Sequence, residues 1–393
     1  MIKNFYWYVI IFFIISFKNV AQQSTLAQVI TLTNDEQELY EQNSFQDLFS
    51  LGRNFKIDGN AQQALRYLKP AIIHNPQDGA ANWELGDVYL LLGDYVKGFL
   101  GFKWRWIHDP RYQKKLWTGQ DLDNKTILVY CQWGLGDTFM YVRYLKLLKS
   151  LGATVLCACQ KPLKNLLSLC PYIDSCITDL SQLPYFDFQA PISYLPEVFN
   201  TTVDTIYNEI PYLYAEKNLI EHWKNYFETD KNFKIGICWQ GSNHNDTQMK
   251  LRPIQLKMLT PLFMIPNVKV FSLQQIDGLE QIPTLPPQCI LHQFDKNFDT
   301  THGSFMDTAA VLKNLDLVIT IDTSIAHLAG ALGTPVWVML SYANEWRFLT
   351  DRSDSPWYPT IMKIFRQSKK RDWNEVIENI IVTLQKKLKN KGL

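Results

Sequence analysis

Short apolar runs alternate with helical patterns from Lys115 to the end of the chain. Runs of this length, bounded by polar residues, are typical of buried strands; they cover residues 126–131, 154–158, 186–192, 234–239, 268–273, 315–321 and 335–340. Helical patterns lie between them, for instance at 137–150 and 162–170. This alternation predicts parallel sheets with crossover helices in two Rossmann-like domains, 115–230 and 231–393. The polar and aromatic segment 211–232 is predicted to be a linker.

Residues 24–114 have a different pattern, in which residues 48–76 and 82–110 repeat at an offset of 34. Small, aromatic and proline positions coincide: Leu51-Gly52 with Leu85-Gly86, Phe55 with Tyr89, Gly59 with Gly93, Ala64 with Gly98, Leu68 with Phe102, and Pro76 with Pro110. The period resembles the tetratricopeptide repeat, a pair of antiparallel helices. Arg105 departs from it, since the first copy has Ala71 there.

Two such units cannot bury their faces alone and need a neighbouring domain or a cap, for which residues 33–43 are a candidate. Two interpretations of the repeat are open. Either its helices only pack, or they hold an acceptor or a partner.

The N-terminus, residues 1–23, contains an apolar run at 5–17 followed by Lys18. This pattern indicates a signal peptide or a hydrophobic anchor. A run of thirteen residues is too short for a spanning helix, which needs roughly 20. The sequence leaves cytoplasmic and membrane-associated locations open, with membrane association through 5–17, and it also leaves open an upstream extension without a role.

Charge and cysteine content exclude several classes of function. Thirty-nine basic and 38 acidic residues give a formal charge of +1, so no nucleic-acid partner is predicted and any anion site must be local. The seven cysteines show no zinc-site spacing and are interpreted as small buried thiols in a reducing compartment. No metal site is predicted.

The first strand-to-helix turn with candidate chemistry is CQWGLGDT, residues 131–138. Gly134 and Gly136 allow a tight turn, and Asp137 and Thr138 are predicted to start the next helix. Open α/β sheets bind ligands at such turns. The alternative interpretation is that Asp137 only caps the helix. Because the third glycine of a dinucleotide fingerprint is missing, a dehydrogenase is not predicted.

The second turn follows the strand at 315–321 and reads DTSIAHLAGALG from Asp322. Thr323 or Ser324 can cap the following helix. Its small side chains would let a diphosphate come close to the helix backbone. Amides at the start of a helix suit a phosphate. His327 lies one turn into the helix and could donate to the same anion, or it could be a satisfied core histidine.

Several motifs together resemble the glycosyltransferases of family 9, the heptosyltransferase-like group, in the subgroup fused to tetratricopeptide repeats. They are CQWGLGDT, ICWQGS (237–242), FSLQ (271–274), DTAA (307–310), the stretch 322–337, DSPWYP (354–359) and FRQ (365–367). The resemblance spans roughly residues 45–375. It implies a GT-B fold, in which two Rossmann-like domains face a cleft, with the acceptor on the first, the donor nucleotide on the second and no metal.

The resemblance also implies roles for single residues. Asp137 matches the catalytic base, beside an acceptor-side loop with Gly134, Gly136 and Thr138. The donor-binding candidates are Asp322, Thr323, Ser324, His327 and Gly330, together with Trp239, Gly241 and Gln274 at strand ends and either Lys250 or Arg252 as a cation near the phosphates. For the two cations, an exposed loop charge is the alternative.

The sequence thus predicts an inverting, metal-independent glycosyltransferase that needs no cofactor and uses a nucleotide-diphosphate sugar as its donor. The acceptor could be a glycan, a lipid or a protein held by the helical repeat. The alternative is a repeat-containing binding or scaffold protein whose transferase-like domain is inactive.

Overall fold

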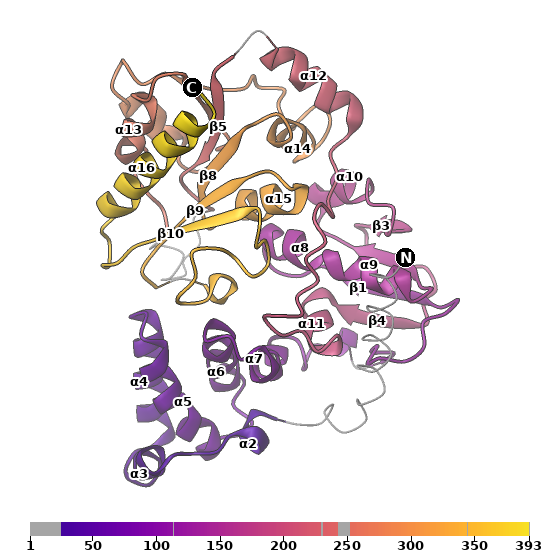
Figure 1. Ribbon diagram of the computed structural model, residues 1–393. Coiled ribbons are helices and arrows are strands. Elements are labelled where there is room, and N and C mark those ends of the chain that lie inside the picture. Colours follow the sequence, from indigo (N-terminus) through magenta and orange to yellow (C-terminus); the bar gives the residue numbers. More distant parts are fainter. Residues whose placement is uncertain (1–24, 113, 229–230, 243–251, 344, 393) are drawn as a thin grey trace.

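The computed structural model describes residues 25–112, 114–228, 231–242, 252–343 and 345–392. Figure 1 shows three parts: a helical region and two α/β halves, each built on its own sheet. The α/β fold class predicted from the sequence, with two Rossmann-like units after an all-α region, is confirmed. The N-terminal segment 1–23 and Lys250 lie outside the described residues, so the predictions made for them stay predictions.

The helical region begins with two short helices, α2 (Leu26–Val29) and α3 (Asn34–Gln42). Two helix pairs follow: α4 (Phe45–Ile57) with α5 (Ala61–His74), and α6 (Gly79–Leu91) with α7 (Tyr95–Phe102). Each of these four helices begins after a residue whose side chain accepts a hydrogen bond from a first-turn amide; these residues are Ser44, Asn60, Asp78 and Asp94. The helix pairs are therefore encoded locally.

The offset of 34 residues is visible in the helices, since α4 and α6 begin at Phe45 and Gly79 (79 − 45 = 34). Glycines allow close helix crossings. A Cβ atom on Gly52 would lie 2.6 Å from Cγ of Leu68, and one on Gly98 would lie 2.5 Å from Cγ of Leu90. The small positions of the repeat are thus explained by packing. Its assignment as a tetratricopeptide repeat stays a prediction.

The first α/β half contains a four-stranded sheet in which all neighbouring strands are parallel, in the order β3-β2-β1-β4. The strands are β1 (Thr126–Tyr130), β2 (Thr154–Ala158), β3 (Ser175–Ile177) and β4 (Phe188–Pro191). The helical pattern at 137–150 forms two helices, α8 (Leu135–Tyr141) and α9 (Arg143–Ser150), and α10 (Lys164–Leu167) and α11 (Leu195–Val198) are short.

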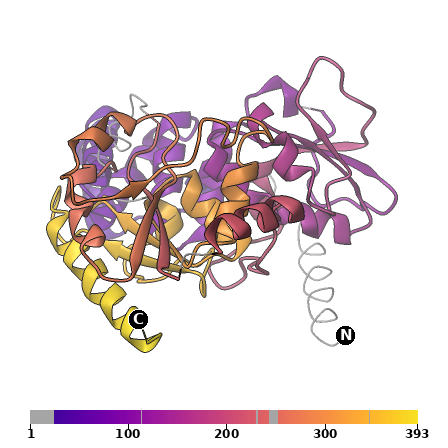
Figure 2. The ribbon, with the colours of Figure 1, turned by 90° about the horizontal axis from the view of Figure 1, so that it is seen from above.

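The second half has a six-stranded sheet, also parallel, in the order β10-β9-β8-β5-β6-β7. Its strands are β5 (Phe233–Cys238), β6 (Val268–Ser272), β7 (Leu291–His292), β8 (Leu317–Ile321), β9 (Val336–Leu340) and β10 (Met362–Arg366). Its helices are α13 (Thr260–Phe263), α14 (Met306–Leu312), α15 (Ser324–Leu332) and α16 (Asn374–Asn390). Figure 2 shows the two halves side by side, with α16 at the outer edge.

The segment 211–232, predicted to be a linker, contains a helix, α12 (Lys217–Phe227). Its buried residues, Leu219, Trp223 and Phe227, repeat every four positions and so form one apolar face. Nε1 of Trp223 donates to Oδ1 of Asp307 on α14 at 3.0 Å. The linker prediction was therefore wrong for these residues, because an amphipathic helix with an exposed polar face also reads as polar and aromatic.

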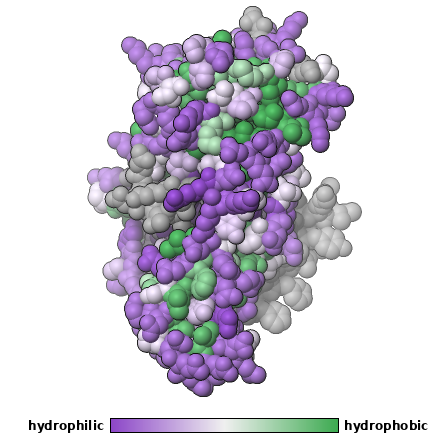
Figure 3. Space-filling view, turned by 90° about the vertical axis from the view of Figure 1, so that its left-hand side faces the viewer, coloured by the Kyte–Doolittle hydropathy of each residue, from purple (hydrophilic) through white to green (hydrophobic). Residues whose placement is uncertain are grey.

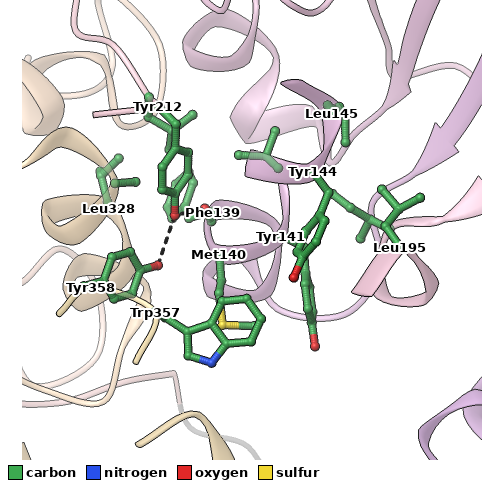
Figure 4. Packing of buried hydrophobic residues seen from close by; sticks show 14 of the residues in the cluster. Phe139, Met140, Tyr141, Tyr144, Leu145, Leu195, Tyr212, Leu328, Trp357 and Tyr358 are labelled. Carbon is green, nitrogen blue, oxygen red and sulfur yellow. Dashed lines mark hydrogen bonds between the residues drawn. The ribbon is translucent and has the colours of Figure 1, made fainter. Parts of the chain in front are cut away.

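A buried arginine joins the two halves. Arg143 on α9 is 0% exposed and donates to the backbone oxygens of Met140, Tyr207 and Trp357, at 2.9 Å in each case, and to the hydroxyl of Tyr212 at 2.8 Å. Figure 4 shows the aromatic packing around Tyr212 and the DSPWYP segment, where Tyr212 donates to Tyr358. The DSPWYP motif therefore lies at the junction of the halves.

The helical region contacts the same junction. Nε1 of Trp357 donates to the hydroxyl of Tyr95 on α7 at 3.2 Å, and α6 packs against the 3₁₀ helix η9 (Trp346–Phe348). On the outer face, Lys370 pairs with Asp58 at 2.6 Å. Figure 3 views the molecule from the left of Figure 1, and hydrophilic residues there separate apolar areas above and below. Because α7 also packs against α11 of the first half, the helical region contacts both halves.

A fragment that starts at Lys115 is expected to aggregate, because it would expose the aromatic side chains, Trp346 and Trp357 among them, that α6 and α7 now cover. Size-exclusion chromatography and light scattering measure this directly. A fragment starting at Thr25 keeps every described helix and is the control. A monodisperse, fully active fragment from Lys115 would show that the helical region is an independent module.

Candidate functional site

The glycine-rich turn of the first half precedes α8, which begins at Leu135, two residues before the predicted start. Gly134 is at the N-cap position, and Oδ2 of Asp137, in the first turn, accepts a hydrogen bond from the amide of Gly134 at 3.1 Å. The prediction that Asp137 and Thr138 start the helix was therefore wrong by two residues. Thr138 is fully buried and donates to Oε1 of Gln160, so it points into the core.

The corresponding turn of the second half precedes α15. Thr323 is at the N-cap position, but its side chain makes no capping hydrogen bond and instead meets Oγ1 of Thr320 at 3.1 Å. Asp322 and His327 are 8% and 4% exposed. Ser324 is the first residue of α15, so the positive end of the helix dipole lies at this turn.

The two turns are in direct contact. A Cβ atom on Gly136 would lie 3.4 Å from Cα of Ser324 and 3.1 Å from Cδ2 of His327, and α8 packs against α15. Gly136 is therefore needed as a small residue because the other half of the molecule approaches it. Gly241 lies beside the same turn, where its Cβ would be 3.8 Å from Cγ2 of Thr323. The sequence-predicted residues Asp137, Ser324, His327 and Gly241 gather in one place.

Five charged side chains connect the turns in an alternating series. Asp137 accepts a hydrogen bond from Nη2 of Arg347, and Nη1 of Arg347 donates to Oε2 of Glu345 at 3.0 Å. Oε1 of Glu345 pairs with Arg252 at 2.5 Å, and Arg252 pairs with Oδ2 of Asp322 at 3.3 Å. The series runs from Asp137 in the first half to Asp322, in the turn before α15, in the second.

Mutual attraction keeps these groups charged. Burial alone would raise the pKa of Asp322, but Arg252 and His327 hold it well below its usual range. Burial likewise would raise the pKa of Glu345, which Arg252 and Arg347 lower. The pKa of Arg347 is above its usual value because Asp137 and Glu345 outweigh the effect of burial, which lowers it. The pKa directions of Asp322, Glu345 and Arg347 thus all favour their charged forms.

His327 has partners at both ring nitrogens. Nδ1 lies 3.2 Å from the hydroxyl of Tyr358, and Nε2 lies 3.8 Å from Oδ1 of Asp322. The ring stands between the DSPWYP segment and the carboxylate of the donor turn. In this arrangement it is a buried histidine at the edge of the site, within reach of an anion that approaches Asp322 and the start of α15.

Three predicted donor-binding residues have other contacts. Trp239 is 0% exposed, and its Nε1 donates to the backbone of Gly278 at 3.2 Å. Gln274 accepts from the amides of Trp239 and Gln240, both at 3.1 Å, and so braces the end of β5. A Cβ on Gly330 would meet the ring of Tyr358 at 2.6 Å. Burial, bracing and close packing account for these three residues in this structure, and their donor-binding roles stay predictions.

Sequence reasoning did not find Arg347, Glu345 or Arg105. The first two lie in the segment before DSPWYP, where their only signal is a pair of opposite charges beside buried aromatic residues. Arg105, noted only as a departure from the repeat, places its guanidinium group 3.9 Å from the ring centre of Trp133 in the glycine-rich turn. The helical region therefore contributes a cation to the rim of the site.

The described residues also bear on the predictions about metals, cysteines and membrane spans. Within the residues that the structure describes, no three or more His, Cys, Asp or Glu side chains are grouped so that they could hold a metal ion. All seven cysteines are free, and Cys131 and Cys157 lie 3.5 Å apart at their sulfur atoms. Among the described helices, none has the length and apolar character required to cross a membrane.

Comparison with known proteins gives relatives of low identity. The chain is 26% identical over 317 residues to Protein FlbA of Caulobacter vibrioides, which covers 73% of this chain and 52% of that protein. It thus spans about half the length of this curated relative. Among solved structures, a family 9 glycosyltransferase from Veillonella parvula has a TM-score of 0.48 and 11% identity, covering 68% of this chain and 98% of that one.

The structure of ADP-heptose lps heptosyltransferase II from E. coli has a TM-score of 0.47 and 12% identity, covering 68% of this chain and all of the other. One family model matches a segment of the chain. Residues 302–369, which include α15, Arg347 and the DSPWYP motif, match Glycosyltransferase family 9 (heptosyltransferase). The similarity to family 9 thus covers residues 302–369, and the turn at Asp322 lies inside this segment.

Proposed function

We propose that the protein is a glycosyltransferase that moves a sugar from a nucleotide-diphosphate donor to an acceptor hydroxyl, with inversion and without a metal. The observation that carries the proposal is the contact between the glycine-rich turn of the first half and the start of α15 in the second. Asp137 of the first half pairs with Arg347 of the second, and the neighbouring Gly136 lies against the start of α15. The family 9 segment covers the second of these turns.

The chemistry assigned to these groups follows from their charges. The carboxylate of Asp137 takes the proton of the acceptor hydroxyl, whose oxygen forms a bond to the anomeric carbon from the side opposite the leaving group. The bond between that carbon and the diphosphate oxygen breaks, and its electron pair leaves with the nucleoside diphosphate. The start of α15 and Arg252 stabilise this negative charge. Asp322 holds Arg252 in place for this role.

The donor is a nucleoside diphosphate sugar, and ADP-heptose is the first candidate because the E. coli neighbour is named for it. The acceptor is an alcohol on a glycan, a lipid or a protein. The helical region lies at the rim of the site, because Arg105 reaches Trp133 in the glycine-rich turn and α6 packs against η9. We propose that it holds the acceptor there.

One observation favours a second candidate, a binding protein without turnover. Each carboxylate oxygen of Asp137 already accepts one hydrogen bond, from Gly134 or from Arg347, so the carboxylate is held by the protein in this conformation. Calorimetric titration of the full chain with ADP, GDP, UDP and NAD, followed by a donor-hydrolysis screen, separates the candidates. Binding of a nucleoside diphosphate with no hydrolysis or transfer of any donor would favour the binding protein.

His327→Ala is expected to weaken nucleoside diphosphate binding by about tenfold while the fold is retained, because the ring lies beside Asp322 near the start of α15. Isothermal titration gives the dissociation constant, and circular dichroism verifies the fold. His222→Ala, at an exposed position of α12, is the matched control and should bind like the parent. Equal affinities for the two variants would remove His327 from the donor site.

A further inference from the structure

Both arginines near the donor turn are held by carboxylates of the protein. Arg252 is shared between Asp322 and Glu345, and Arg347 is shared between Glu345 and Asp137. These side chains are largely buried, with 9% to 20% of each exposed. A diphosphate that approaches the start of α15 therefore meets two arginines that are already engaged by three carboxyl groups of the protein.

Arg347 is the member of this series that reaches both halves. It extends from η9 in the second half to Asp137 in the first, and its charge also acts on Asp322 at the donor turn. Within the described part of the chain, its Nε is buried without a hydrogen-bond partner. A buried donor without an acceptor is costly, so the contacts seen here do not satisfy the whole guanidinium group.

We propose that Arg347 is a positioning residue that holds Asp137 when the site is empty and turns to the diphosphate when the donor binds, which frees the carboxylate. This inference rests on the proposed function. The exchange follows from charge and geometry. The diphosphate offers Arg347 two or more anionic oxygens in place of one carboxylate oxygen, and it arrives at the helix end beside Gly136.

The consequence for Asp137 depends on all the charged and titratable groups that face it. These are Arg347 on η9, Arg105 from the helical region, Tyr141 on its own helix and His327 on α15. Arg347 is the only one of them shown hydrogen-bonded to the carboxylate in the described residues. When it leaves, Oδ1 of Asp137 loses its hydrogen-bond donor and is open to the proton of the acceptor hydroxyl. Donor binding would thereby prepare the base before the acceptor reacts.

A double-mutant cycle on the full chain tests this exchange, with ADP, GDP and UDP titrated by calorimetry. Asp137→Asn should bind the preferred diphosphate about tenfold more tightly than the parent, because Arg347 no longer has to leave an ion pair; tenfold corresponds to about 1.4 kcal/mol. Arg347→Met should bind about tenfold more weakly. In the Arg347→Met background, Asp137→Asn should have no further effect.

The outcomes separate this inference from the proposed function. No binding of any diphosphate by the parent would overturn both. Binding by the parent with unchanged affinity in Asp137→Asn would overturn only the exchange. If Asp137→Asn tightens binding equally in the Arg347→Met background, simple repulsion by Asp137 is the cause, and the exchange is again wrong.

Two further variants keep the test decisive. Arg352 lies five residues after Arg347 and pairs with Asp354. Arg352→Met should therefore leave the affinity for the diphosphate unchanged. Arg347→Lys keeps the charge but cannot form two parallel hydrogen bonds, and should bind with intermediate affinity. If Arg347→Met does not fold, the cycle is run with Arg347→Lys, in which the effect of Asp137→Asn should fall below threefold. An undiminished tenfold effect there would contradict the exchange.

Discussion

Asp137→Asn is expected to lower the transfer rate at saturating donor by roughly 10²- to 10⁴-fold, the usual contribution of a general base. Asparagine keeps an oxygen that can accept from the amide of Gly134, so the start of α8 should be preserved. It cannot take a proton from an acceptor hydroxyl. Turnover of a donor identified by the hydrolysis screen is the measurement, and circular dichroism verifies the fold.

The control for this variant is Asp121→Asn, which makes the same substitution at an exposed position before β1 and should leave turnover unchanged. Near-parental turnover in Asp137→Asn would remove Asp137 from the mechanism. The structure would then assign it only two roles, as a hydrogen-bond partner of Gly134 and as an anchor for Arg347. Tighter diphosphate binding together with lost turnover is the combination that the structure favours.

Arg143→Met is expected to lower the free energy of unfolding by at least about 3 kcal/mol. Methionine fills a similar volume but leaves three buried backbone oxygens and the hydroxyl of Tyr212 without their donor. The midpoint of chemical denaturation, or the loss of soluble protein, measures the effect.

Lys146→Met is the matched control for Arg143→Met, because it removes a cation from the same helix. Lys146 pairs with Glu209, and both side chains are partly exposed, at 32% and 64%. A pair of this kind contributes at most about 1 kcal/mol. Equal stabilities of the two variants would show that Arg143 does not join the halves in the way its hydrogen bonds indicate.

The strands with continuous apolar runs could be predicted well from the sequence. β2 matches its predicted range, and β8 and β9 differ from theirs only at the ends. Strands β3, β7 and β10 were missed for a physical reason. β3 and β7 have three and two residues, and Lys363 and Arg366 interrupt the apolar pattern of β10 at the sheet edge. Edge strands are only half covered, and their composition therefore resembles that of loops.

The site could be predicted only where local sequence determines it. Glycines and polar residues at strand ends identified the turns at Asp137 and Asp322, and the structure brings these turns into contact. The link through Arg347 and Glu345 connects to Asp137, about 200 positions earlier in the chain. A periodic pattern in the sequence cannot predict such a contact. Trp239 and Gln274 show why a strand end alone is a weak signal, since it can be braced from within as well as open to a ligand.

The hydrogen bond between Trp357 of the second half and Tyr95 of the helical region lies among aromatic side chains from both parts. The backbone oxygen of Trp357 also accepts a hydrogen bond from Arg143 of the first half. All three parts of the molecule thus share one buried junction. Their stabilities are therefore coupled, and unfolding should proceed as one cooperative event. A core substitution in α6 or α7, distant in sequence from Asp137, would then reduce the population of molecules with an intact site. Sequence variation in the helical region is therefore constrained by the stability of the two α/β halves.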